Sequence, residues 1–137
     1  MIKAIDHVAI AVRSIEESLP LYTNGLGLGK ISYEEIPSQK VRVAMIPVGE
    51  SRIELLEPTS PDSPVAKFIA KHGEGMHHIT LRVDEMDSHL ERLRKRGVAL
   101  INDPPVAGAE GSLVTFIHPK SAHGVLIELC LKKEGKK

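Results

Sequence analysis

The sequence predicts an α+β fold in which a β-α-β-β-β module occurs twice and forms a half-barrel sheet around a cleft, with helices outside. Two strand-like segments that contain a histidine, DHVAIAV with His7 and HHITLRV with His78, open the two copies. Two segments that contain a glutamate, RIELL with Glu54 and LIELC with Glu128, close them at nearly the same spacing. A repeated pattern at matched spacing indicates one supersecondary unit written twice.

The first module, residues 1–57, opens with a strand at residues 4–13, where apolar and β-branched residues predominate. Ser14 is the expected N-cap of a helix, because two glutamates follow in its first turn. The helix is expected to end near Asn24, with its first turns distorted by Pro20. Three further strands are expected at residues 30–36, 41–48 and 52–57.

A connector at residues 58–75 holds three prolines and then a short helix that stops at Gly73. The second module, residues 76–131, continues from its first strand into the helix DEMDSHLERLRKRG. Strands near residues 98–101, 112–118 and 124–131 complete it, with a glycine-rich loop at 106–112. The charged tail 132–137 is expected to fray, and the chain as a whole to form one domain.

The alternation of side chains along a strand places each candidate ligand opposite the bulky aliphatic residues of its own strand. His7 shares a face with Ala9 and Ala11, which are small and are expected to leave room in the cleft. Each glutamate lies between two aliphatic residues, where an ionised carboxylate is costly unless it is paired or coordinated. Two imidazole nitrogens and two carboxylates form a ligand set for a borderline divalent metal. The metal ligands are therefore predicted to be His7, Glu54, His78 and Glu128.

The composition excludes several classes of function. With 18 basic and 18 acidic residues, the net charge is zero and gives no case for a nucleic-acid or membrane partner. The single cysteine, Cys130, excludes an intrachain disulfide, and no apolar run approaches the length of a membrane span. The N-terminus does not have the pattern of a signal peptide, so the cytoplasm is the expected location. Cys130 is expected to be a buried, unreactive thiol.

The remaining histidines are expected to have lesser roles. His77 has the parity of the core face, which favours a structural role, whereas His72 and His89 are expected to be solvated residues of helices. The loop HPKSAHG, which contains His118 and His123, lies just before the second glutamate strand. Contact with a substrate is considered for this loop.

These features resemble the vicinal oxygen chelate superfamily and, within it, the methylmalonyl-CoA epimerases. The segments IDHVAIAV, ELLEPTSPDSPVAKFIAKHGEGMHHI and HPKSAHGVLIEL carry the resemblance, which spans residues 3–131. It implies that the four predicted ligands hold a first-row metal, with Co²⁺ favoured and Ni²⁺, Mn²⁺ or Zn²⁺ as alternatives. It also implies a homodimer, with pairing of the modules within a chain or across subunits left open.

The resemblance further implies a reaction, the interconversion of (R)- and (S)-methylmalonyl-CoA by loss of the α-proton through a metal-stabilised enolate. Glu128 is expected to be one acid/base, and Glu54, a metal-bound water or another group serves the opposite face of the substrate. Some epimerases have a glutamate where this chain has Val43, so the second base stays open. Lys120 and His123 are expected to contact anionic groups of the substrate.

Two rival functions share the same fold. A glyoxalase I-type lyase would act on a hemithioacetal and would use the same set of ligand types. A non-catalytic protein that sequesters a ligand would favour an aromatic groove without a metal set, and aromatic residues make up only 3% of this chain.

Overall fold

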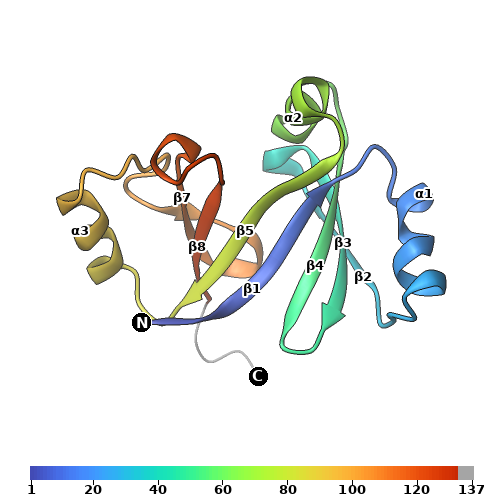
Figure 1. Cartoon of the computed structure of the whole chain (residues 1–137), viewed down its shortest axis with the longest axis horizontal. Helices are drawn as coiled ribbons and strands as arrows, with labels where there is room; N and C mark the ends of the chain where they lie inside the picture. The colour runs from blue at the N-terminus through green and yellow to red at the C-terminus, as the bar shows by residue number, and fades with distance from the viewer. Residues whose placement is uncertain (133–137) are drawn as a thin grey trace. The chain divides into compact units, whose positions relative to one another are not determined.

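The computed structural model describes residues 1–132, and the chain divides into two compact units. The His7 unit comprises His7–His77, and the His78 unit comprises Met1–Asp6 together with the chain from His78 onward. Strand β1 (Ile2–Ala11) gives its first half to the His78 unit and its second half to the His7 unit (Figure 1). Each unit is described by itself.

The sheet of the His7 unit has the strand order β2-β3-β4-β1. Strand β1 is parallel to β4, and the other neighbours are antiparallel. The further strands of this unit are β2 (Ser32–Ile36), β3 (Val41–Val48) and β4 (Ser51–Pro58). A 3-10 turn, Pro37–Gln39, joins β2 to β3. A parallel pair needs a crossover connection, and the segment that contains α1 begins it.

Helix α1 (Ile15–Pro20) begins as predicted, because the Ser14 hydroxyl accepts a hydrogen bond from the backbone N–H of Glu17. The expected distortion of the first turns is wrong in its position, because Ile15–Pro20 is α-helical and the irregular part, a π-helical segment at Leu21–Gly25, follows the proline. Proline has no N–H to donate within a helix. The wider turn is closed by the N–H of Leu26, which donates to the carbonyl of Leu21 at 2.9 Å.

Both faces of this sheet are covered. On one face, α1 buries Ile15 against an apolar cluster that includes Ala44 and Leu55. On the other, Val65 and Ile69 of α2 (Pro64–His72) belong to the same cluster as Ala9, Ala11, Val41, Val43 and Leu56. The expectation that Ala9 and Ala11 leave open space is therefore wrong, because both are completely buried. Their small side chains let the connector helix approach the sheet closely.

The His78 unit has the strand order β1-β5-β8-β7-β6, with β5 parallel to β8. Its strands after β1 are β5 (Gly75–Val83), whose first residues belong to the other unit, β6 (Val106–Ala107), β7 (Leu113–Ile117) and β8 (Ile127–Leu131). Leu90 of helix α3 (Asp87–Lys95) and the N-cap residue Met86 pack in a cluster with Val83 and Leu129. Short 3-10 turns lie at Ala109–Gly111 and Pro119–Ser121.

The strand predicted at 98–101 is reduced to one antiparallel bridge, with backbone hydrogen bonds from Ile101 to Phe116 and from His118 to Ala99 on either side. Only Leu100 forms a bridge there, to Ile117, while the N–H of Ala99 donates to the Ser121 hydroxyl. Two prolines follow at 104 and 105 and cannot donate to a ladder. The edge strand of this unit is β6, which lies in the segment expected to be a glycine-rich loop.

Helix α3 also corrects the expectation for His89, which is only 7% exposed rather than solvated. His89 precedes Leu90 on the side of the helix that faces the sheet, so the helical period brings it inward. His72, at the end of α2, is exposed as expected. Within residues 1–132, no helix has the length and apolar character needed to cross a bilayer.

Capping of α2 by Ser63 is expected to stabilise the covered face of the His7 unit. Ser63 is completely buried, and its hydroxyl accepts from the N–H of Val65 and donates to the carbonyl of Gln39. Ser63→Ala should lower the free energy of unfolding by about 1–2 kcal/mol in chemical denaturation. The control is Ser38→Ala at an exposed position, and equal stability of the two variants would contradict the role of the cap.

Candidate functional site

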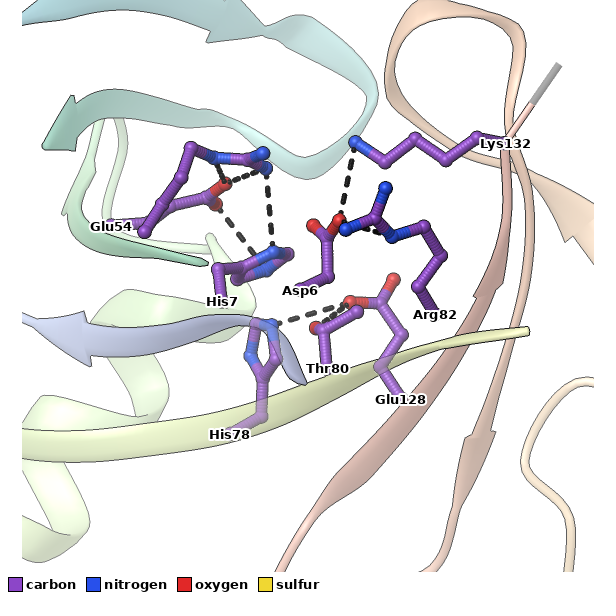
Figure 2. A network of polar contacts seen from close by, with 9 residues as sticks. Asp6, His7, Glu54, His78, Thr80, Arg82, Glu128 and Lys132 are labelled. Atoms are coloured by element: carbon purple, nitrogen blue, oxygen red, sulfur yellow. Dashed lines mark hydrogen bonds and ion pairs between the residues drawn. The ribbon is translucent and has the colours of Figure 1, made fainter. Parts of the chain in front are cut away.

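The first histidine–glutamate pair lies on neighbouring parallel strands of the His7 unit. Glu54 of β4 is in register with Ala9 of β1, so His7 lies one step along the same face. The Nε2 atom of His7 is 3.4 Å from Oε1 of Glu54, and both side chains are about nine-tenths buried (Figure 2). The prediction that these two residues share a face is confirmed.

Arg52 completes this first pair. Its Nε and Nη2 atoms donate to Oε2 of Glu54 at 3.1 and 2.6 Å, and Nη2 lies 3.4 Å from Nδ1 of His7. The guanidinium thus holds one carboxylate oxygen, while the other faces the imidazole. The sequence pattern did not identify Arg52 as a site residue, although its position two residues before Glu54 places it on the same face of β4.

The second pair repeats this arrangement in the His78 unit. Glu128 of β8 is in register with Thr80 of β5, and Nε2 of His78 is 3.3 Å from Oε1 of Glu128. The Thr80 hydroxyl donates to the same carboxylate oxygen at 2.5 Å, and the Thr80 residue is completely buried. The ring of Phe116 meets the His78 ring edge-on, with centroids 5.6 Å apart (Figure 2).

The two pairs are equivalent in geometry but differ in the residue that holds the carboxylate. In each, a histidine Nε2 faces a glutamate Oε1 at nearly the same distance. Glu54 is held by the cationic Arg52, and Glu128 by the neutral hydroxyl of Thr80. Each unit therefore offers one imidazole and one oriented carboxylate, of the types that bind divalent first-row metals.

The proposed substrate contacts lie in a surface segment of the His78 unit. Lys120 is in the turn Pro119–Ser121, and His123 follows it with a positive φ of 56°; both are exposed. The backbone N–H of Lys120 donates to Nδ1 of His118 at 3.0 Å. In the described part of the chain, neither the Lys120 nor the His123 side chain forms a hydrogen bond or ion pair with His78 or Glu128.

Two other side chains behave as expected from the sequence. Cys130 is buried beside the second pair, and burial, followed by the charge of Glu128, raises the pKa of its thiol. The structural role predicted for His77 agrees with its packing against Phe68 of α2, with ring centroids 4.8 Å apart.

Comparison with known proteins defines the family. Residues 6–116 match the Glyoxalase/Bleomycin resistance protein/Dioxygenase superfamily. The chain is 37% identical to the ethylmalonyl-CoA/methylmalonyl-CoA epimerase of Cereibacter sphaeroides, over 94% of this chain and 98% of that protein. It is also 37% identical to the human mitochondrial methylmalonyl-CoA epimerase, over 91% of this chain and 72% of that protein.

A solved structure agrees with these relatives. A variant of the Streptomyces coelicolor methylmalonyl-CoA epimerase, in complex with 2-nitronate-propionyl-CoA, superposes with a TM-score of 0.90. The match covers 100% of this chain and 99% of that chain at 36% identity. The α+β fold class predicted from the sequence is thereby confirmed.

The chain therefore belongs to the Glyoxalase/Bleomycin resistance protein/Dioxygenase superfamily. Within it, the relatives place the chain in the family of methylmalonyl-CoA epimerases. Members of this family are isomerases, and the expectation of an enzyme is confirmed.

The hydrogen bond from Thr80 to Glu128 is expected to matter for metal affinity. Thr80→Val keeps the shape of the side chain and removes the donor, so Co²⁺ binding should weaken roughly tenfold in a calorimetric titration. Thr115→Val is the matched control, since Thr115 is also completely buried in this unit but donates to the backbone carbonyl of Asn102. Equal loss of Co²⁺ affinity in both variants would count against a special role for Thr80.

The thiol of Cys130 is expected to resist alkylation in the folded protein. Because burial raises its pKa, less thiolate is present at a given pH, and access is restricted as well. Labelling with iodoacetamide at pH 8 should be slow in buffer and fast in guanidinium chloride, as followed by mass spectrometry. A native labelling rate equal to the denatured rate would contradict this.

Proposed function

We propose that this protein interconverts (R)- and (S)-methylmalonyl-CoA. The observation that carries the proposal is the buried histidine–glutamate pair, which recurs in each unit of a chain closely related to epimerases of this substrate. Epimerisation requires removal of a proton from the carbon between two carbonyl groups and its return from the opposite side. Such a reaction needs a stabiliser for the negative charge that develops and an oriented base.

We further propose that His7, Glu54, His78 and Glu128 hold one divalent metal, with Co²⁺ first and Ni²⁺, Mn²⁺ or Zn²⁺ as alternatives. The donor set fits such an ion, because it combines neutral imidazoles with carboxylates on buried, oriented side chains. When bound, the metal would act as a Lewis acid toward the substrate oxygens. Assembly as a homodimer is part of the same proposal.

Arg52 is proposed to orient the metal ligand Glu54 without binding the metal itself. A second carboxylate adds negative charge to the ligands, and the guanidinium of Arg52 offsets it through two hydrogen bonds to Glu54. Partners of this kind orient metal ligands and are a common part of metal centres. Both of these hydrogen bonds go to Oε2, and the Oε1 atom of Glu54 faces Nε2 of His7 at 3.4 Å.

Glu128 is proposed as one acid/base of the reaction. Thr80 and His78 both contact its Oε1 atom, so the carboxylate is oriented before substrate arrives. Val43 cannot serve the opposite face of the substrate, because it is apolar and lies in the cluster under α2. Glu54 is therefore proposed for that face.

The loop that holds Lys120 and His123 is proposed to contact anionic groups of the substrate. Both side chains are exposed, and Lys120 carries a positive charge at neutral pH. They stand in the segment HPKSAHG, immediately before the strand that carries Glu128.

The test is proton NMR of methylmalonyl-CoA in D₂O. The wild-type protein with Co²⁺ should cause loss of the α-proton signal, and EDTA should stop it. Glu128→Gln should slow the exchange at least about 100-fold, because it removes a general acid/base. Glu91→Gln, on the exposed side of α3, is the control.

Absence of exchange with every metal tested would overturn the epimerase proposal. Incubation with a methylglyoxal–glutathione hemithioacetal then distinguishes the remaining functions of the fold. Turnover would indicate a lyase, and tight binding without turnover would indicate sequestration.

A further inference from the structure

A second polar cluster in the His78 unit lies outside the histidine–glutamate pair. Its centre is Asp6, which is only 3% exposed. The Nε atom of Arg82 and the Nζ atom of Lys132 are each 3.5 Å from Oδ1 of Asp6 (Figure 2). A buried carboxylate needs such partners, but one cation is enough to balance its charge.

The two cationic side chains carry more positive charge than Asp6 neutralises, so they could bind a further anion. Their side chains are 37% and 39% exposed, so both reach solvent. In residues 1–132, Asp6 is the sole ion-pair or hydrogen-bond partner of either side chain. The contact of Arg82 with Asp6 is made by Nε, and the guanidinium carries further N–H donors on Nη1 and Nη2. Two donors in a planar fork match the oxygens of a phosphate or carboxylate.

The repeat shows that the fold does not require this cluster. Counting from the paired histidine and glutamate, Ala11 and Pro58 occupy the corresponding positions in the His7 unit. Ala11 is completely buried in the cluster formed with α2. The residue that corresponds to Asp6 is His77, which packs on Phe68 of α2. At these positions the His7 unit is therefore apolar and covered by α2, whereas the His78 unit has two cationic side chains.

The position of the cluster indicates what it would bind. Arg82 follows His78 and Thr80 on the same face of β5, and Lys132 stands in the same relation to Glu128. Four residues of strand correspond to ~13 Å between Cα atoms. Both charged groups turn toward Asp6. A molecule whose acyl end is held at the histidine–glutamate pair, and which carries a second anionic group, would present that group to these two cations.

We propose that Arg82 and Lys132, positioned by Asp6, bind the phosphates of a coenzyme A thioester. This inference rests on the proposed function, since that function supplies a substrate with an acyl end and a separate phosphorylated end. The cluster then fixes the nucleotide end of the ligand, and the histidine–glutamate pair receives the acyl end. The cluster would thus raise affinity for the coenzyme form of the substrate over shorter thioesters.

The first experiment measures binding without turnover. Coenzyme A and adenosine 3′,5′-bisphosphate are titrated calorimetrically into wild type, Arg82→Gln, Lys132→Met and the double variant. Each single change should weaken binding of coenzyme A about threefold to tenfold, and the double change more. High salt should reduce the difference between wild type and variants.

Lys95→Met is the matched control. It removes one positive charge from the same unit, at an exposed position on α3 that forms only a long contact to Glu91. Its affinity for coenzyme A should equal that of wild type. Equal affinity of the double variant and wild type, or the same loss in Lys95→Met, would overturn the proposal. Circular dichroism of each variant checks that it is folded.

A kinetic comparison separates the phosphates from the acyl carboxylate. The KM for methylmalonyl-CoA should rise in the variants by a larger factor than the KM for methylmalonyl-pantetheine, which has no nucleotide. Equal factors would place the recognised anion on the acyl group and overturn the assignment to phosphates. If wild type binds coenzyme A through Arg82 and Lys132 but exchanges no α-proton, the cluster stands and the epimerase proposal fails.

Discussion

A buried carboxylate held against a buried imidazole constrains each half of this protein. Ionised groups are costly to bury without partners, and in each unit the partners come from the neighbouring parallel strand or the same strand. Glu54 is held by His7 and Arg52, and Glu128 by His78 and Thr80. Because the register of these strands sets the contacts, a shift of one residue would turn the glutamates toward the opposite face. The register of the parallel strands therefore determines the geometry of both histidine–glutamate pairs.

The two copies have diverged around this shared constraint. In the His7 unit, α2 covers the end of the face that carries Ala11, and a guanidinium holds the carboxylate. In the His78 unit, a neutral hydroxyl holds the carboxylate, and the equivalent end of the face presents Arg82 and Lys132. The two units therefore share the histidine–glutamate pair but differ in the residues that surround it.

The sequence predicted what depends on local periodicity and on the repeat. Short stretches of chain were enough to predict the strands that carry the four candidate ligands and the helix cap at Ser14. The errors concern non-local contacts. A strand was expected at residues 98–101, but its pairing depended on Ile117, and only one bridge formed. The packing of α2 over Ala9 joins segments that are distant in the sequence and could not be predicted from local periodicity. The hydrogen bonds from Arg52 to Glu54 depend on side-chain conformations, which the sequence pattern does not give.

The histidine–glutamate pairs of the two units are proposed to hold a single metal ion. Crystallography of the cobalt-loaded protein, with data collected at the cobalt absorption edge, tests this most directly. A single shared site would give one anomalous peak for each chain, bonded to His7, Glu54, His78 and Glu128. Two separate peaks, one at each pair, or a peak bonded to other residues would contradict it.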